Sequence, residues 1–384
     1  MARILFVVPP LTGHVNPTVS VARTLEARGH EVAWVAHPGT VRPLLPAGAR
    51  VFALPEAVNP GVVEQVTDRA RAVRGAAALK FLWEDFLIPL ARSMLPGIEA
   101  AVSEFAPSVL AVDQQAVAGG LVARKRGVPW ATLATTSAGV TDPLAALPQV
   151  KRWLADLLAG LEREAGLSPT DAGELSPHLV IAFTTEAMVG PLERFPAHYR
   201  FVGPSISDRP ETAAFPFDQL RRPCVLVSMG TVNAEASGRF YATTIAALED
   251  HAAQVILVAP PELVPRLPNN FMSQRYVPQL ALLPHVDAVV CHGGHNTTCE
   301  ALANGLPLVI APIKDDQPIV ADQVVAAGAG LRVKFGRVQP AELRDAVTRV
   351  LDEPGFRESA VRIRASFAAA GGASAAASAL EALS

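Results

Sequence analysis

A short turn between two apolar runs, at residues 292–297, gathers two histidines, two glycines, an asparagine and a threonine. Residues 287–291 predict a strand and residues 297–303 predict a helix, so the turn would lead into a helix N-terminus. Backbone N–H groups and the positive end of the helix dipole favour an anion at such a place, and glycines let the anion approach the backbone closely. With donors from His292, Asn296 and Thr297, the turn predicts a phosphate or pyrophosphate site.

Other interpretations fit the same residues without an anion. Thr297 and Glu300 have the spacing of a capping box, and Asn296 can cap the helix by itself. The segment also contains four side chains of zinc-ligand type, Cys291, His292, His295 and Cys299. Their spacings match no standard zinc site, so we expect no metal here. The local pattern leaves capping and anion binding open.

A second group with chemical potential lies near the N-terminus, in the segment PPLTGHVNPT. His14 follows a predicted buried strand and precedes a predicted helix at residues 18–28, so we expect it in a loop at the carboxyl end of the strand. Asn16 is the candidate N-cap and Pro17 the first helical residue. Such a histidine is either a solvent-exposed loop residue or a general base, and a base needs an acceptor that orients its other ring nitrogen.

The turn at 292–297 and the segment around His14 both lie between predicted strands and helices. Strands that alternate with helices along the chain predict parallel α/β sheets. The apolar runs predicted as strands span residues 4–8, 30–36, 107–113, 127–135, 224–231, 254–260, 287–291 and 306–313. A segment rich in Pro, Ser and charge separates the two series. We therefore expect a domain at residues 1–205, a linker at 206–222 and a domain at 223–384, whose last helix can pack back on the first domain. Ligands of such sheets bind at the carboxyl ends of strands, here in the cleft between two domains.

Composition narrows the class of protein. The chain has 384 residues, of which 50% are apolar, and this suits two α/β domains. A net charge of −3 without a long basic run argues against a nucleic-acid partner. The three cysteines lack disulfide spacing, and we expect a cytoplasmic protein without a signal peptide or membrane span. Neither half contains the glycine-rich motif of ordinary dinucleotide or Walker sites.

The stretch from Tyr276 to Gln317, YVPQLALLPHVDAVVCHGGHNTTCEALANGLPLVIAPIKDDQ, resembles the donor-binding signature of the family-1 nucleotide-sugar glycosyltransferases. The P-Q pair, the H-x-G-x-N-[ST]-x-x-E core, the G-x-P and the D-Q ending all recur in register. That family includes plant secondary-metabolite enzymes and bacterial antibiotic and macrolide glycosyltransferases. The resemblance implies a GT-B fold, with two Rossmann-like domains facing across a cleft, the acceptor in the N-terminal domain and the nucleotide sugar in the C-terminal domain.

The resemblance implies a donor contact for each matching position. His292 would contact the pyrophosphate, while Asn296 and Thr297 would cradle phosphates or the sugar. Glu300 would accept the ribose hydroxyls. The other implied donor contacts are Tyr276 and Val277 at the base, Gln279 of the P-Q pair, Gly294 and His295 of the turn, and Asp316 and Gln317 at the sugar hydroxyls. The segment SMGT matches the family's first loop of the C-terminal domain and adds Ser228, Gly230 and Thr231.

The resemblance also implies the catalytic pair. His14, in G-H-x-N-P, stands where these enzymes keep their base. The family's orienting aspartate ends a later strand, a position that Asp113 holds here. Asp113 has a further interpretation as the N-cap of a helix beginning near Ala116, and the two roles are compatible. The implied reaction is an inverting transfer that needs no metal and no cofactor besides the nucleotide-sugar co-substrate.

The N-terminal half would build the acceptor pocket. Its apolar stretch at residues 76–95 contains Phe81, Trp83 and Phe86, which are either core residues, the wall of an acceptor pocket or a peripheral membrane contact. Thr12 and Thr136 are further candidates for this pocket. These segments carry no readable code for the acceptor's identity.

We therefore expect an inverting glycosyltransferase, monomeric or homodimeric, that moves a hexose from a UDP- or TDP-sugar to a hydroxyl of a small apolar natural product. Glucose is the first candidate, because a carboxylate and a carboxamide can pair with adjacent sugar hydroxyls. The alternatives are a carotenoid or lipid glycosyltransferase, a nucleotide-sugar epimerase of the same fold and an inactive helper subunit. His14 with Asp113 argues against the epimerase, and the nearly complete signature argues against the helper subunit.

Overall fold

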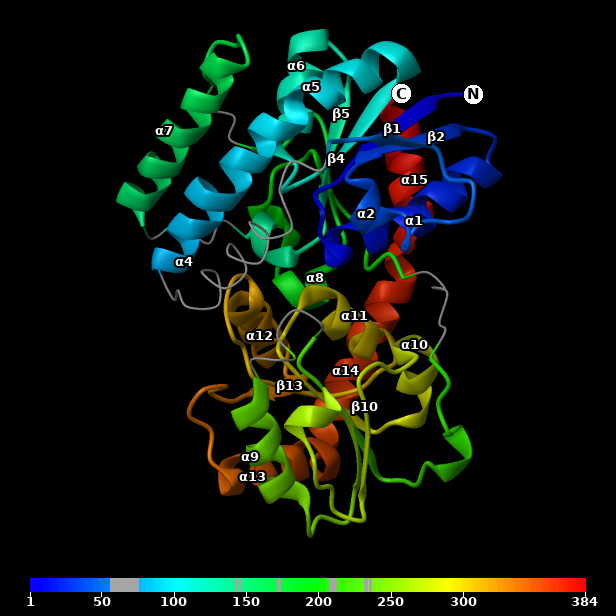
Figure 1. Cartoon of the computed structure of the whole chain (residues 1–384), viewed down its shortest axis with the longest axis vertical. Helices are drawn as coiled ribbons and strands as arrows, with labels where there is room; N and C mark the ends of the chain where they lie inside the picture. Colours follow the sequence, from blue (N-terminus) through cyan, green and yellow to red (C-terminus); the bar gives the residue numbers. More distant parts are fainter. Residues whose placement is uncertain are drawn as a thin grey trace. The chain divides into compact units, whose positions relative to one another are not determined.

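The structure is a computed structural model that describes residues 1–55, 76–141, 144–145, 147–170, 174–206, 213–230, 234 and 237–384. By its internal contacts the chain divides into two units. The first contains Met1–Thr185, Pro191–Ser207 and Ala370–Ser384, and the second contains Glu186–Gly190 and Asp208–Ala369. Of the expected linker at 206–222, residues 207–212 lie outside the described residues. Each unit is built around its own parallel sheet (Figure 1).

Seven parallel strands form the sheet of the first unit, in the order β3-β2-β1-β4-β5-β6-β7. Their bounds are β1 Arg3–Val7, β2 Glu31–Ala36, β3 Val51–Ala53, β4 Val109–Asp113, β5 Trp130–Ala134, β6 Val180–Ala182 and β7 Tyr199–Phe201. The central strands are almost wholly apolar because helices cover both faces of the sheet. Side chains alternate between those faces, so Leu5 enters one core cluster and Phe6 enters the other.

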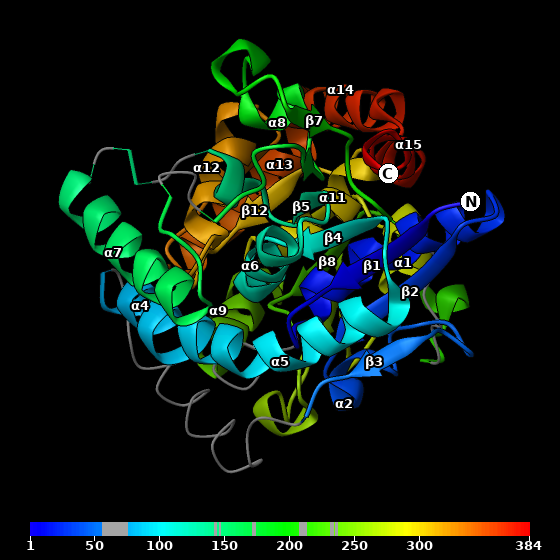
Figure 2. The same cartoon turned by 90° about the horizontal axis from the view of Figure 1, so that it is seen from above.

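Two groups of helices cover the faces of this sheet. Helices α5 (Ile88–Phe105), α6 (Val117–Arg126) and α7 (Pro148–Glu164) share the core that contains Leu5. Helices α1 (Thr12–Ala27) and α15 (Gly372–Leu383) share the core that contains Phe6, and Figure 2 shows α5 and α15 on opposite sides of the strands. The short segments of this unit are α2 Pro38–Val41, α4 Ala76–Lys80, the π-helix η1 Phe81–Leu87, and the 3-10 turns η2 Ser137–Val140 and η3 Leu192–Arg194.

The C-terminal helix α15 packs against α1 within the first unit (Figure 1). Its small side chains allow a close approach, and Leu380 is fully buried in the shared core. At the rim, Glu381 accepts from Arg28 at 2.7 Å and its Oε1 lies 2.8 Å from Nε2 of His30. Residues 370–384 thus complete the core of the first unit, although they follow the second unit in the sequence.

Six parallel strands form the sheet of the second unit, in the order β10-β9-β8-β11-β12-β13. Their bounds are β8 Cys224–Ser228, β9 Gln254–Val258, β10 Phe271–Gln274, β11 Ala288–Cys291, β12 Leu308–Ile310 and β13 Gly330–Arg332. Its helical segments are α8 Glu186–Val189, η4 Phe217–Gln219, α9 Gly238–Leu248, η6 Pro261–Leu263, α10 Gln279–Leu282, η7 Leu283–His285, α11 His295–Ala303, α12 Gln317–Ala326, α13 Pro340–Asp352 and α14 Pro354–Ala370. Among the described residues, no helix is long and apolar enough to cross a membrane.

Candidate active site

His14 and Asp113 lie side by side in the first unit. Nδ1 of His14 is 2.9 Å from Oδ1 and 3.0 Å from Oδ2 of Asp113. Asp113 ends β4 and is fully buried, whereas the His14 side chain is 16% exposed. Because β1 and β4 are neighbouring parallel strands, the segment after β1 meets the end of β4 at one edge of the sheet. A partly accessible imidazole oriented by a buried carboxylate is suited to general base catalysis.

His14 lies in a helix, which corrects the predicted loop. Helix α1 begins at Thr12, so His14 belongs to its first turn. Asn16 and Pro17, predicted as N-cap and first helical residue, both lie inside the helix. Pro17 lies beyond the first turn, so it removes one backbone hydrogen bond of the helix. The prediction was wrong because the chain enters the helix almost directly after the prolines at 9–10, without the Asn-Pro start signal.

Two further groups hold the Asp113 carboxylate. The hydroxyl of Thr135 donates to Oδ2 at 2.7 Å and lies 2.9 Å from Nδ1 of His14. The backbone N–H of Gln115 donates to Oδ1 at 2.8 Å, whereas helix α6 has no side-chain cap, so the predicted N-cap role of Asp113 is wrong. Thr135 is absent from the predicted catalytic pair. The strand register that pairs Asp113 with Leu133 could have indicated it, because a side chain two residues later returns to the same face.

The ends of β8 and β11 bring His292 against two glycines in the second unit. The last residues of these strands are register partners, so the segments after them are neighbours. A Cβ on Gly230 would lie 2.7 Å from Cε1 of His292, and a Cβ on Gly294 would lie 2.4 Å from its Nε2. A side chain at either position would therefore displace the His292 ring, and Gly230 also has a φ of 73°, which favours glycine. The structure thereby groups four predicted donor residues, Ser228, Gly230, His292 and Gly294. The predicted Thr231 lies outside the described residues.

Helix α11 begins at His295, two residues earlier than predicted, and Gly294 occupies its N-cap position without a side-chain cap. Asn296 and Thr297 therefore lie in the first turn, and neither caps the helix. The capping box is wrong as well, because Thr297 is not the N-cap residue. Oε2 of Glu300 accepts from Nε2 of Gln279 at 2.5 Å. Because no side chain caps it, the start of α11 presents the positive end of the helix dipole beside the His292 loop.

Burial sets the charge state of His292. Burial lowers the pKa of its imidazole and outweighs the negative charge of Asp316, which raises it. Nδ1 is buried and has no hydrogen-bond partner among the described residues. The ring is therefore neutral at neutral pH, and a bound anion can accept a hydrogen bond from its N–H.

The other histidine and the cysteines of this segment lie in packing contacts. His295 is buried, and its Nε2 lies 3.5 Å from Sγ of Cys299. Burial raises the pKa of the Cys299 thiol, with a further increase from Glu300, and burial raises the pKa of Cys291 to about 11. Both thiols stay protonated at neutral pH. Across the described part of the chain, no group of three or more His, Cys, Asp or Glu side chains is arranged to hold a metal ion.

The remaining predicted donor residues lie before α10 and at the start of α12. Tyr276 is 58% exposed, and Val277 is half-buried. Asp316 occupies the N-cap position of α12, and Gln317 is its first residue. Oε1 of Gln317 accepts from the backbone N–H groups three and four residues before it, at 3.1 and 2.8 Å. The carboxamide oxygen therefore holds its own loop, which leaves Nε2 as the atom suited to a sugar hydroxyl.

The predicted acceptor residues lie in different environments. Trp83 is buried in the core beneath α5, and Phe86 packs against the same core. Both lie in the π-helix η1 and serve the core, whereas Phe81 is half-buried at its start. Thr12 is exposed at the start of α1, and Thr136 is buried, with its hydroxyl capping η2. Phe81 and Thr12 thus retain accessible surface for a ligand.

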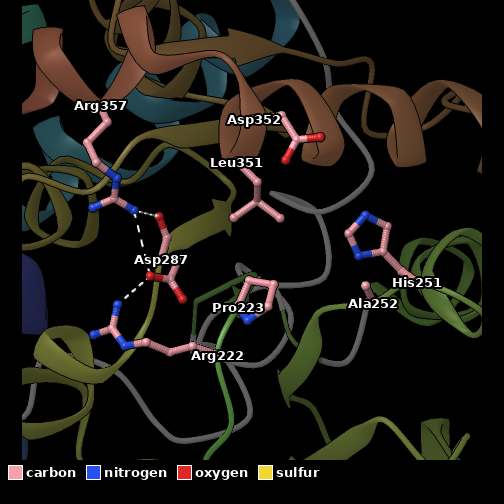
Figure 3. A pocket seen from close by; sticks show the side chains of 8 residues that line it. All are labelled: Arg222, Pro223, His251, Ala252, Asp287, Leu351, Asp352 and Arg357. Atoms are coloured by element: carbon pink, nitrogen blue, oxygen red, sulfur yellow. Dashed lines mark hydrogen bonds and ion pairs between the residues drawn. The ribbon is translucent and has the colours of Figure 1, made fainter.

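A separate pocket of about 440 Å³ lies at the opposite, amino-terminal edge of the second sheet (Figure 3). Arg222 and Arg357 both pair with the Asp287 carboxylate, which also accepts from the backbone N–H of Cys224 at 2.9 Å. These contacts join the segment before β8 and the start of α14 to the residue just before β11. The pocket contains none of the predicted site residues, and its two arginines are engaged by one carboxylate.

Known proteins are similar in sequence to this chain over nearly its whole length. Residues 242–383 match the family model described as erythromycin biosynthesis protein CIII-like, C-terminal domain. The 4'-demethylrebeccamycin synthase of Lentzea aerocolonigenes is 33% identical, and the alignment covers 96% of each chain. The NDP-glycosyltransferase YjiC of Bacillus subtilis strain 168 is 30% identical over 97% of this chain and 95% of its own.

A solved structure shares the fold of both units. The spinosyn rhamnosyltransferase SpnG complexed with thymidine diphosphate has a TM-score of 0.76 and 25% identity, over 99% of this chain and 100% of that one. Two relatives of 30% and 33% identity that match nearly the full length, two parallel-sheet units and the matching donor signature all agree. The chain therefore belongs to the family-1 nucleotide-sugar glycosyltransferases of the GT-B fold.

Proposed function

We propose that the protein is an inverting, metal-independent glycosyltransferase that moves a hexose from a UDP- or TDP-sugar to a hydroxyl of a small apolar natural product. The contact between His14 and Asp113 carries the proposal, because transfer to a hydroxyl needs an oriented base. His292, the two glycines against it and the start of α11 support the other half of the reaction, the departure of a nucleoside diphosphate.

Asp113 fixes the tautomer of the proposed base. Its carboxylate faces Nδ1 of His14, so the ring proton lies on Nδ1 and the basic lone pair on Nε2. Nε2 takes the proton of the acceptor hydroxyl while that oxygen bonds to the anomeric carbon, on the face opposite the diphosphate. The bond from the anomeric carbon to the diphosphate oxygen breaks, its electron pair leaves with the diphosphate, and the configuration inverts. Buried Asp113 stabilises the imidazolium that forms.

The second unit stabilises the negative charge of the leaving diphosphate. The start of α11 offers the positive end of a helix dipole, and Asn296 and Thr297 add polar side chains in its first turn. The neutral ring of His292 donates one hydrogen bond. Together these groups take the part that a divalent cation plays in metal-dependent transfer.

The nucleoside end of the donor fits Tyr276 and Glu300. An exposed tyrosine ring suits stacking on a pyrimidine, and stacking does not discriminate uracil from thymine. The thymidine diphosphate bound by the spinosyn relative is one of the two ligands expected. The Glu300 carboxylate, held by Gln279, can accept hydrogen bonds from both ribose hydroxyls of a UDP-sugar, or from the single 3′-hydroxyl of a TDP-sugar.

The sugar end of the donor fits Asp316 and Gln317. The carboxylate of Asp316 accepts from one hydroxyl, and Nε2 of Gln317 donates to its neighbour. A deoxygenated sugar would lose these hydrogen bonds, at a cost of roughly 1–3 kcal/mol each. We therefore place glucose first among the donor sugars.

The acceptor class follows from the relatives. The 4'-demethylrebeccamycin synthase and the spinosyn rhamnosyltransferase are each named after a natural product. We extend that class to this chain, with a hydroxyl as the nucleophile. Among the described residues, half-buried Phe81 and exposed Thr12 are the candidates for contact with such an acceptor.

A donor panel tests this proposal. UDP-glucose, TDP-glucose and a TDP-2,6-dideoxysugar would each be offered with hydroxylated natural-product acceptors, and products identified by mass spectrometry and by NMR of the anomeric centre. We expect glucosides of inverted configuration, and a selective loss of glucose over dideoxysugar transfer in Asp316→Ala. A dideoxysugar preference above about tenfold that Asp316→Ala leaves unchanged would overturn the sugar assignment. Epimerised donor without acceptor would identify an epimerase, and turnover only with an added partner protein would identify a helper subunit.

A further inference from the structure

We infer that Thr135 is a positioning residue for glycosyl transfer, whose hydroxyl holds the Asp113 carboxylate and thereby fixes the tautomer and orientation of His14. The inference rests on the proposed role of His14 as the base. Thr135 directly follows β5 and is 3% exposed. Its Oγ1 lies 2.7 Å from Oδ2 of Asp113 and 2.9 Å from Nδ1 of His14, so it contacts both members of the pair.

The hydrogen-bond geometry assigns each proton of this cluster. Two acceptors do not face each other at 2.9 Å without a proton between them, so Nδ1 of His14 carries its hydrogen toward Asp113. Protonated Nδ1 has no lone pair to accept from Thr135, and the threonine hydroxyl therefore donates to Oδ2 of Asp113. The backbone N–H of Gln115 occupies Oδ1. The buried carboxylate thus receives three donors, and both of its oxygens are fixed.

The sheet determines where the Thr135 hydroxyl points. Asp113 and Leu133 are register partners on neighbouring parallel strands. A side chain two residues after Leu133 returns to the same face, which brings Thr135 beside Asp113. The backbone N–H of Thr135 bonds to the carbonyl of Leu133 at 3.1 Å, so the chain turns at once and holds this position. A β-branched side chain has few rotamers, and the hydroxyl is therefore well oriented.

Removing the Thr135 hydroxyl should allow the ring proton of His14 to move from Nδ1 to Nε2. Without its donor at Oδ2, the carboxylate of Asp113 can rotate, because the terminal torsion of an aspartate has a broad minimum. His14 would then also populate the tautomer with hydrogen on Nε2, which cannot accept the acceptor's proton. We expect kcat to fall while the donor KM stays unchanged. Loss of the hydrogen-bond partner behind a metal-ligating histidine typically costs roughly 10- to 100-fold in activity, and we expect a loss of the same order for this histidine.

Four variants separate positioning from folding. Thr135→Val removes the hydroxyl at nearly constant shape, Thr135→Ala removes it with a smaller side chain, and Thr135→Ser retains it. Thr132→Val is the matched control, because Thr132 is a buried threonine of β5 whose hydroxyl accepts from the N–H of Ser176 at 2.7 Å. Steady-state kinetics with glucose donors would be combined with ¹⁵N NMR of the His14 ring nitrogens, which reports the tautomer without any turnover.

The inference predicts that Thr135→Val and Thr135→Ala lose roughly 10- to 100-fold in kcat at unchanged donor KM and gain the Nε2–H tautomer. Thr135→Ser and Thr132→Val should retain the kcat and tautomer of the wild type. Wild-type kcat and tautomer in the two hydroxyl-free variants, beside an inactive His14→Ala, would overturn the inference and leave the base standing. An equal loss of kcat in Thr132→Val would also overturn it. An active His14→Ala would refute the base, and this inference with it.

Discussion

Replacing Gly294 by alanine tests whether His292 belongs to the donor site. The new Cβ would lie 2.4 Å from Nε2 and 2.9 Å from Cε1 of His292, well inside the roughly 3.5–4.0 Å optimum for non-bonded atoms. The backbone adds no strain, since Gly294 has φ −61° and ψ 135°, values that alanine adopts readily. The substitution should therefore act by displacing the His292 ring.

The size of the effect follows from the hydrogen bond that is lost. A hydrogen bond to a charged group contributes about 1.5–3 kcal/mol, so binding of a nucleoside diphosphate should weaken roughly 10- to 150-fold. Stability should change less, because alanine in place of glycine at an uncapped N-cap position costs about 1 kcal/mol or less. A folded protein with weak diphosphate binding is the expected result.

Titration calorimetry with UDP and TDP measures this effect. Gly336→Ala is the matched control, because a Cβ there meets no atom within 4 Å. In a double-mutant cycle, Gly294→Ala should cost little extra in a His292→Ala background, since the displaced ring is already gone. Wild-type affinity in Gly294→Ala, or full additivity with His292→Ala, would refute the placement of His292 at the diphosphate.

Two further predictions concern stability and metal dependence. Burial raises the pKa of Glu381, but hydrogen bonds from His30 and Arg28 outweigh it and hold this pKa below its usual range. A lowered carboxyl pKa stabilises the fold above the ordinary glutamate range, and this stabilisation is lost as pH falls. Glu381→Gln should therefore lower Tm at about pH 7 and have little effect below about pH 4, whereas equal losses at both would contradict the ion pair's role. Turnover should also survive exhaustive EDTA treatment, because the start of α11 and His292 stand in for a cation, and activity that returned only with Mg²⁺ or Mn²⁺ would show otherwise.

The apolar runs predicted the central strands, because strands buried on both faces of a parallel sheet are continuously hydrophobic. The strands that were missed are β3, β6, β7, β10 and β13, each of only three or four residues. The same runs placed His14 and Asp113 near strand ends. Their contact depends on β1 lying next to β4, which no local pattern encodes, and only the family resemblance indicated the pair.

Helix starts and side-chain roles were less predictable from the sequence. Asn16 and Thr297 are strong local capping signals, yet α1 and α11 both begin before them, because the preceding turn decides where the helix starts. The role of Thr135 depends on the register of two strands. The side-chain oxygen of Gln317 accepts from backbone N–H groups of the preceding loop, and this depends on how that loop folds. Such features require the tertiary structure, since the residue types alone fit several roles.

Turnover by His14→Ala tests the central claim most directly, because the substitution removes the proposed base and leaves the donor groups of the second unit unchanged. We predict a kcat lower by roughly 10²–10⁴ with a hydroxyl acceptor, and unchanged binding of UDP or TDP by calorimetry. Asp113→Asn should lower kcat by a comparable or smaller factor through the wrong tautomer, with the same unchanged binding. Near-normal turnover of a hydroxyl acceptor by a folded His14→Ala protein would contradict the account.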